Sequence, residues 1–231
     1  MSASLYTVID DKVISPKIHF YRIEPTAQGL DASIREIFDS ISQLCWLSKF
    51  DGSFLKDSFS VCANYSINYI KNNVLNKNTD KATEEAGEYV VSELSRQTIV
   101  NRKGYLDVPL GELFKQKASG NPGFDYFSRN LNDEILFAEA KYKSSSNAYG
   151  VATKQIVQFI DIRKDISDLK DLQPFVGENA CYKATQGEKG FIVAFSATDM
   201  KTDMLIRHLQ ENDCYKKLCG YNELICVAVN I

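Results

Sequence analysis

Two stretches decide the fold of this chain: Gly123-Phe124-Asp125-Tyr126-Phe127 and Glu134-Ile135-Leu136-Phe137-Ala138-Glu139-Ala140-Lys141-Tyr142. Both are rich in aromatic and branched apolar residues, and the turn-forming run Asn130-Leu131-Asn132-Asp133 lies between them. This pattern predicts a β-hairpin. Folding the hairpin about residues 131–132 places Asp125 opposite position 138 or 139 of the second strand.

Side chains alternate between the two faces of a strand, so Glu139 and Lys141 are expected to project from one face of the second strand. The other face carries the side chains Leu136, Ala138, Ala140 and Tyr142. Asp125 is expected within reach of Glu139. A carboxylate inside an apolar strand is costly to bury without a partner. A plain cross-strand ion pair on a solvated face is the competing interpretation.

Outward from the hairpin, helix and strand patterns alternate from residue 81 to residue 231. Thr83 is predicted to cap a helix whose apolar positions recur every three or four residues. After the hairpin we expect a helix over 152–163, a buried strand over 191–195, a helix over 200–210, which Asp199 would cap, and a buried strand over 224–229. This order predicts an α/β sandwich built on a mixed sheet.

Residues 1–80 are predicted to form an N-terminal α+β extension that carries no chemistry of its own. Strand patterns precede a helix over 30–50, capped by Asp31, and a partly helical stretch over 59–75. The apolar positions of that stretch are Val61, Ile67, Ile70 and Val74. The polar run that follows marks a domain boundary at residue 80, and we interpret the extension as a possible partner-docking surface.

Composition restricts the class of protein. The chain has 231 residues, 44% of them hydrophobic and 25% charged, with a net charge of -3, which is typical of a folded globular protein. No apolar run approaches the roughly 20 residues that span a bilayer, and the first residues lack a signal-peptide pattern. We therefore expect a cytoplasmic protein without a membrane partner, whose six cysteines stay reduced. Cys214, Cys219 and His208 match no standard zinc spacing.

The hairpin acids indicate metal-assisted hydrolysis. Asp125 and Glu139, together with the backbone carbonyl of Ala140, offer the oxygen ligands that suit Mg²⁺ or Mn²⁺. The ammonium group of Lys141 would steady an attacking hydroxide or the phosphate that it attacks. The chain has only two histidines, so catalysis is expected to depend on carboxylates, lysines or hydroxyls. These features predict hydrolysis of a phosphodiester.

Gly123-Phe124-Asp125 and Glu139-Ala140-Lys141, preceded by a helix that bears Gly87-Glu88, resemble the motif of the PD-(D/E)xK nuclease superfamily. The resemblance covers about residues 81–200. It implies a restriction-endonuclease-like αβββαβ fold, in which Asp125 and Glu139 bind the metal and Lys141 serves the nucleophile.

The same resemblance implies further site residues. Glu88 or Glu85, one turn apart on the preceding helix, would add a carboxylate to the metal site. Gln155 falls where many members carry a glutamine on the helix after the motif strand. The chain departs from the pattern in that Pro122 stands three residues before Asp125 instead of directly before it.

More narrowly, the Gly-Phe-Asp segment, the Phe-Ala-Glu-Ala-Lys strand and its continuation Ser144-Ser145-Ser146 resemble the nuclease subunits of Hachiman anti-phage defence systems. This resemblance implies a DNA nuclease that a partner superfamily 2 helicase restrains, and that phage or damaged DNA releases. The chain contains no GxxxxGK[ST] loop, so any ATP-driven step is expected to belong to the partner and no nucleotide to bind this chain.

Charge gives an independent indication about nucleic acid. Phosphate neutralisation supplies most non-specific DNA affinity, yet the chain is net acidic. Between residues 139 and 164 five basic residues outnumber two acidic ones, and Lys143 and Lys154 are the predicted nucleic-acid contacts. Two alternatives stay open: a non-catalytic docking or regulatory module of a helicase complex with the same fold, and an RNA nuclease, since no motif here encodes contacts to a 2′-hydroxyl.

Overall fold

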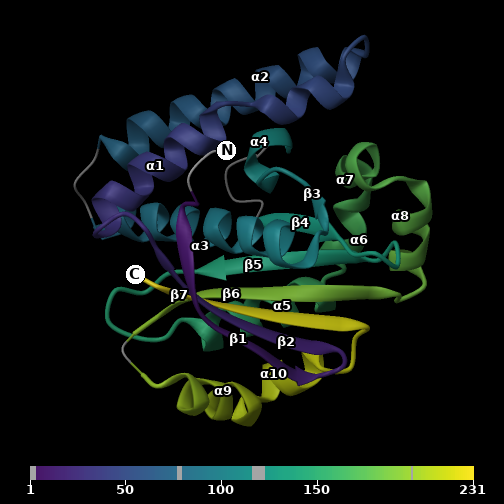
Figure 1. The fold of residues 1–231 in the computed structure, drawn as a ribbon. Coiled ribbons are helices and arrows are strands. Elements are labelled where there is room, and N and C mark those ends of the chain that lie inside the picture. Colours follow the sequence, from purple (N-terminus) through teal and green to yellow (C-terminus); the bar gives the residue numbers. More distant parts are fainter. Residues whose placement is uncertain (1–3, 77–79, 116–122, 199) are drawn as a thin grey trace.

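The computed structural model describes residues 4–76, 80–115, 123–198 and 200–231, and within these ranges seven strands form one sheet (Figure 1). The strands are β1 (Tyr6–Ser15), β2 (Ile18–Pro25), β3 (Leu106–Asp107), β4 (Tyr126–Arg129), β5 (Ile135–Lys141), β6 (Lys189–Ala197) and β7 (Glu223–Asn230). Their order in the sheet is β1-β2-β7-β6-β5-β4-β3. Four consecutive strands, β2, β7, β6 and β5, run parallel, whereas β1 is antiparallel to β2, β4 to β5 and β3 to β4. The predicted α/β class and mixed sheet are therefore confirmed.

The predicted hairpin is formed by β4 and β5. Tyr126 lies opposite Ala138, and the N–H of Asp125 donates to the carbonyl of Ala138 at 2.9 Å. Asp125 is thus next to Glu139 in the register, as the turn position predicted. β5 is buried at every residue except Lys141, because it lies inside the sheet between β4 and β6.

Helices cover both faces of the sheet (Figure 1). One core cluster joins Leu136, Ala138 and Ala140 of β5 to α1 (Leu30–Ser42) and α3 (Asp80–Lys103). The other joins Ile135 and Phe137 to α5 (Tyr149–Asp161), α9 (Thr202–Glu211) and α10 (Asp213–Leu218). The predicted alternation along β5 is therefore confirmed.

The first 80 residues contribute to the same sheet as the rest of the chain. β2 pairs in parallel with β7, from Ile18 opposite Leu224 to Ile23 opposite Val229. This pairing buries Phe20, Tyr21 and Ile23. Strands from both sides of residue 80 thus share one hydrogen-bonded sheet, and the domain boundary stays a prediction.

The helix predicted over 30–50 breaks at Leu44, which has a left-handed backbone with φ of 50°. An α-helix cannot continue through this conformation, and the chain resumes as a 3-10 helix, η1 (Cys45–Phe50). The break lets Trp46 pack on Phe59 and Phe175, with ring centroids 5.9 and 5.8 Å apart. Aromatic packing therefore overrides the apolar spacing of the sequence.

The second N-terminal helix starts earlier than predicted, as α2 (Phe54–Tyr69), and continues as a π-helical segment, η2 (Ile70–Leu75). Ile70 and Val74 are buried as expected, but Val61 is 72% exposed. Nine residues, about two and a half helical turns, separate Val61 from Ile70, so the two side chains lie on opposite sides. The apolar residues listed for this stretch therefore do not all share one side of the helix.

Two predicted helix caps are wrong. The N-cap position of α1 is Gly29, with no side-chain cap, and Asp31 lies in the first turn. Thr83 lies inside α3, which begins at Asp80. The predicted cap Asp199 lies outside the described residues, and the N-cap of α9 is Lys201. In both wrong cases the helix begins before the predicted capping residue.

Three short helices between α5 and β6 were not predicted: α6 (Lys164–Ser167), α7 (Leu169–Val176) and α8 (Glu178–Thr185). A further short helix, α4 (Gly111–Phe114), lies before β4. Buried ion pairs fix this region, because Asp168 binds Lys115 at 2.6 Å and Lys164 at 3.2 Å. No helix within the described ranges is both long and apolar enough to cross a membrane.

Candidate functional site

The predicted site residues gather at the carboxyl end of β5. Glu139 and Lys141 belong to this end of the strand, and β5 is parallel to β6. Asp125 precedes β4 on the other side of β5. In open α/β sheets, ligands bind beyond the carboxyl ends of the parallel strands, so this is the edge where a site is expected.

Glu139 is the most deeply buried acid of the group, at 1% exposed. Its Oε1 lies 2.9 Å from Lys141 Nζ, whereas its Oε2 is buried and has no hydrogen-bond partner among the residues that the structure describes. Burial raises the pKa of Glu139 well above its usual value, and the negative charges of Asp125 and Glu88 raise it further, against the opposing effect of Lys141. A buried acid with one unmatched oxygen is costly to keep, so Glu139 is the residue of this group best placed to accept a further ligand.

Lys141 lies between two acids. Its Nζ is 2.9 Å from Glu139 Oε1 and 3.1 Å from Glu88 Oε1. Burial by itself would lower the pKa of Lys141, but the charges of Glu139, Asp125 and Glu88 outweigh burial and raise this pKa. Lys141 is therefore an ammonium ion at neutral pH, suited to stabilising negative charge and not to accepting a proton.

α3 approaches β5 closely enough for Glu88 to reach Lys141 because residue 87 is glycine. A Cβ atom at Gly87 would lie 2.1 Å from Cγ of Tyr142, so the tyrosine ring occupies the space of the missing side chain. Burial raises the pKa of Glu88, although Lys141 opposes the shift. The sequence left Glu88 and Glu85 as alternatives; the structure brings Glu88 to the site.

Glu85 lies one turn away, where Tyr69 of α2 donates to its Oε2 at 3.5 Å. Asp125 is fixed to the same strand as Glu139, because its Oδ2 accepts from the N–H of Ala140 at 2.8 Å. This contact uses the amide of Ala140, and the role predicted for its carbonyl oxygen stays a prediction. The hairpin therefore holds Asp125 and Glu139 side by side through main-chain contacts.

The remaining predicted residues lie around this group. Gln155 is half-buried on α5, the helix that packs on β5 and β6, and no described hydrogen bond joins it to the acids. The side chains of Lys143 and Lys154 are exposed. Ser196 of β6 fixes the backbone of Lys143, accepting from its N–H at 2.8 Å and donating to its carbonyl at 3.1 Å.

The predicted basic surface is smaller than the sequence count suggests. Lys164 is paired with Asp168, and Lys115, which would extend the surface, is largely buried and paired with the same acid. Arg129 donates to the carbonyl of Val176 and pairs with Asp133. Lys143 and Lys154 stay available to an approaching anion.

The oxygen atoms of Asp125 and Glu139 are chemically suited to binding a hard divalent cation. The two carboxylates of Asp125 and Glu139, one of which has an unmatched oxygen, are oxygen ligands of the kind that Mg²⁺ prefers. Within residues 4–76, 80–115, 123–198 and 200–231, no group of three or more His, Cys, Asp or Glu side chains is close enough together to hold an ion by itself. Mg²⁺ commonly binds through one or two carboxylates and completes its coordination with water and substrate phosphates, so a Mg²⁺ site here stays a prediction.

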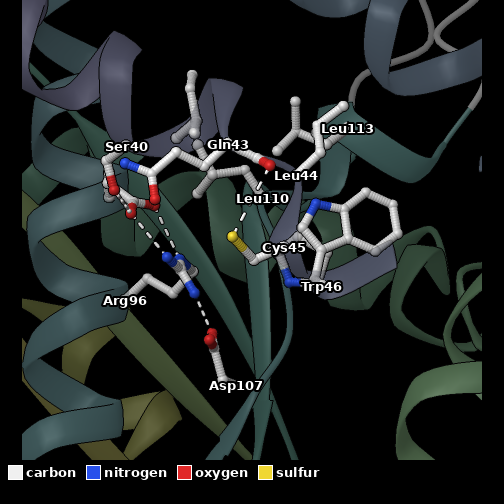
Figure 2. Close-up of a pocket in the computed structure, with 12 residues that line it drawn as sticks. Ser40, Gln43, Leu44, Cys45, Trp46, Arg96, Asp107, Leu110 and Leu113 are labelled. Atoms are coloured by element: carbon white, nitrogen blue, oxygen red, sulfur yellow. Dashed lines mark hydrogen bonds and ion pairs between the residues drawn. The ribbon is translucent and has the colours of Figure 1, made fainter. Parts of the chain in front are cut away.

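A second cluster of charge lines a pocket of about 120 Å³ between α1, α3 and the segment after β3. Figure 2 shows Arg96 pointing toward Asp107, with Trp46 on the opposite wall. Arg96 donates to both oxygens of Glu93, at 2.6 and 2.8 Å, and to Asp107. The three-residue spacing of Glu93 and Arg96 on a helix was the only signal of this pair in the sequence.

Comparison with known proteins adds no assignment: no family model matches the chain, and no curated protein matches it.

The six cysteines, including Cys214 and Cys219, are all free thiols.

Proposed function

We propose that the chain is a metal-dependent nuclease of the PD-(D/E)xK type, with a restriction-endonuclease-like αβββαβ core, that hydrolyses phosphodiester bonds in DNA. The observation that carries the proposal is the unmatched Oε2 of Glu139, in a residue 1% exposed, beside the carboxylate of Asp125. An acid of this kind is kept where a cation completes its coordination.

Asp125, Glu139 and, once released from Lys141, Glu88 would hold Mg²⁺ or Mn²⁺. The bound ion supplies a Lewis acid and an activated water. Lys141 keeps its proton, because three carboxylates raise its pKa, and its ammonium group stabilises the charge that develops on the phosphate. The exposed Lys143 and Lys154 contact the nucleic-acid backbone on the approach to the site.

By its resemblance to Hachiman nuclease subunits, the chain is proposed to be the effector of an anti-phage complex that a superfamily 2 helicase restrains. Two observations support delivery to DNA by a partner. The net charge is -3, and several of the basic residues around the site are neutralised by Asp168 and Asp133. Such a surface gives little non-specific DNA affinity of its own.

The test is cleavage of duplex DNA by the purified chain with Mg²⁺ or Mn²⁺. We expect Glu139→Gln and Lys141→Met to lower cleavage by about 10² or more, as removal of a group acting in the transition state does. Glu188→Gln and Lys170→Met, at exposed positions outside the site, are the matched controls. Equal cleavage by all five proteins would contradict the proposal.

A second candidate function is a non-catalytic module that docks on and regulates the helicase. It is favoured by one observation: Lys141 already neutralises Glu88 and Glu139, so the acids are satisfied in part without a metal. Calorimetric titration with Mg²⁺ and Mn²⁺ separates the two candidates. Binding that Glu139→Gln removes supports the nuclease, and no binding supports the module.

A further inference from the structure

α2 carries apolar side chains on two opposite sides. Only Phe59, Ala63 and Ser66 of its 16 residues are buried, on the side that packs on α4 and η1. The opposite side exposes Phe54 at 80% and Val61 and Tyr65 at 72% each. Figure 1 shows α2 on the outside of the molecule. A helix that is apolar around its circumference is typically buried on both sides.

The outward side of α2 is almost free of charge. Residues 58–70 include no charged residue, and the exposed ones are Ser58, Val61, Asn64, Tyr65, Asn68 and Tyr69. The exposed side of α9, by contrast, carries Asp203, Arg207 and Glu211. We call the side defined by Phe54, Val61, Asn64 and Tyr65 the α2 outer surface.

This chemistry selects the kind of occupant. Nucleic acids and anionic membranes attract surfaces rich in Lys and Arg, and the α2 outer surface has neither. Depletion of charge together with exposed aromatic side chains is typical of the core of a protein–protein interface. The occupant is therefore a protein surface of similarly low charge.

The two ends of α2 differ in charge in a way that favours a second copy of the same helix. Near the N-terminal end, Lys56 is paired with Asp51 at 2.5 Å, and the neighbouring Asp57 is exposed. Lys71 is exposed just beyond the C-terminal end. Asp57 and Lys71 lie equally far before and after Asn64, so two α2 helices packed antiparallel about Asn64 bring each Asp57 near the partner's Lys71. A parallel pair would place like charges together.

We propose that the α2 outer surface is the self-complementary interface of a symmetric homodimer, with the two α2 helices antiparallel. In such an interface each residue meets the same patch on the partner copy. Val61 and Tyr65 form its apolar centre, and Asp57 and Lys71 set its direction. This inference is independent of the proposed catalysis, because it concerns a different face and a different measurement.

Sedimentation velocity over a wide range of protein concentrations tests the interface. We expect a concentration-dependent dimer, and we expect Val61→Glu with Tyr65→Glu to raise the dissociation constant on the order of tenfold or more, as changes at the centre of an interface do. Leu131→Glu, in the exposed β4–β5 turn, is the matched control and should leave it unchanged. A monomer at every concentration, or a dimer that the double variant does not weaken, would overturn the proposal.

A charge exchange tests the antiparallel direction. Asp57→Lys and Lys71→Asp should each weaken the dimer, because each places like charges at both ends, and the double exchange should restore it. If the double-exchange variant dimerises as weakly as either single variant, the antiparallel arrangement is contradicted. Circular dichroism of each variant checks that α2 stays folded.

Discussion

Two buried clusters of charge each include one acid of α3, and they differ in how completely they are satisfied. Around Arg96, both oxygens of Glu93 accept hydrogen bonds and Asp107 accepts a third. Around Lys141, one oxygen of Glu139 binds the ammonium and the other has no partner. Each cluster places one cation against a deeply buried carboxylate, Glu93 or Glu139. The unmatched oxygen is what separates a candidate site from a structural ion cluster.

The largest expected effect is at the satisfied cluster. Arg96→Met leaves Glu93, which is itself buried, without its cation, and removing one partner of a buried ion pair costs about 3–5 kcal/mol. Urea unfolding followed by circular dichroism measures the loss. DNA cleavage per folded molecule should not change. If cleavage falls, the Arg96 cluster is part of the functional site, and the distinction between the two clusters is wrong.

The next effect concerns the approach of α3 to β5. Gly87→Ala places a methyl group against the Tyr142 ring, and such overpacking costs about 1–3 kcal/mol. The shift of the helix also moves Glu88 from Lys141, so cleavage should fall together with stability. Gly150→Ala is the control: the nearest atom to its added Cβ is 3.9 Å away, and a helical alanine should be neutral or stabilising by up to about 1 kcal/mol.

A smaller effect is expected in the pH dependence of stability. The pKa of Glu139 is raised in the folded chain, so the native state keeps a proton that the unfolded state loses. The free energy of unfolding therefore falls as pH rises from the ordinary carboxyl pKa of about 4.3 toward the raised value. Glu139→Gln removes this contribution and should flatten the slope, measured by thermal unfolding at a series of pH values.

The metal proposal adds a condition to the same experiment. Because a metal binds the deprotonated carboxylate, added Mg²⁺ should raise the unfolding temperature more at pH 8 than at pH 5, and only in the wild type. An equal shift in Glu139→Gln would place the ion elsewhere.

The smallest effects belong to the exposed lysines outside both clusters. Lys143→Ala and Lys154→Ala should change the free energy of unfolding by less than about 0.5 kcal/mol. Each variant should weaken DNA binding to a similar extent for all DNA sequences. The slope of log affinity against log salt concentration should fall by about one, which corresponds to one lost phosphate contact. Fluorescence anisotropy with labelled duplexes at several salt concentrations measures this, and Lys170→Ala, at an exposed position of α7, is the control.

The hairpin and its register were predictable because they depend on local information. The alternation of β5 and the turn at 130–133 place Asp125 beside Glu139 without reference to the rest of the chain. The choice of Glu88 over Glu85 was not predictable, since it depends on contact between Gly87 and Tyr142, residues more than 50 positions apart in the sequence. The exposure of Val61 follows from local information as well, because nine residues of helix place it on the opposite side from the buried Ile70.

The helices between α5 and β6 were missed because α6 has four residues and α7 and α8 have eight each, fewer than the roughly 11 residues over which helical periodicity is read. They are fixed by tertiary ion pairs such as Lys115 with Asp168 and Lys189 with Asp165. The parallel pairing of β2 with β7 was also not predictable from the sequence, because the apolar pattern of one strand does not identify a partner strand that is distant in the chain.

That pairing has a consequence for how the protein is made. β2 emerges from the ribosome roughly 200 residues before β7, and contacts of such long range form late and slowly. Until β7 is synthesised, the edge of β2 that pairs with β7 has no partner strand, and Phe20 and Ile23 are not yet buried. A chaperone that binds nascent chains would find its target in this hairpin, and the completed sheet would release it.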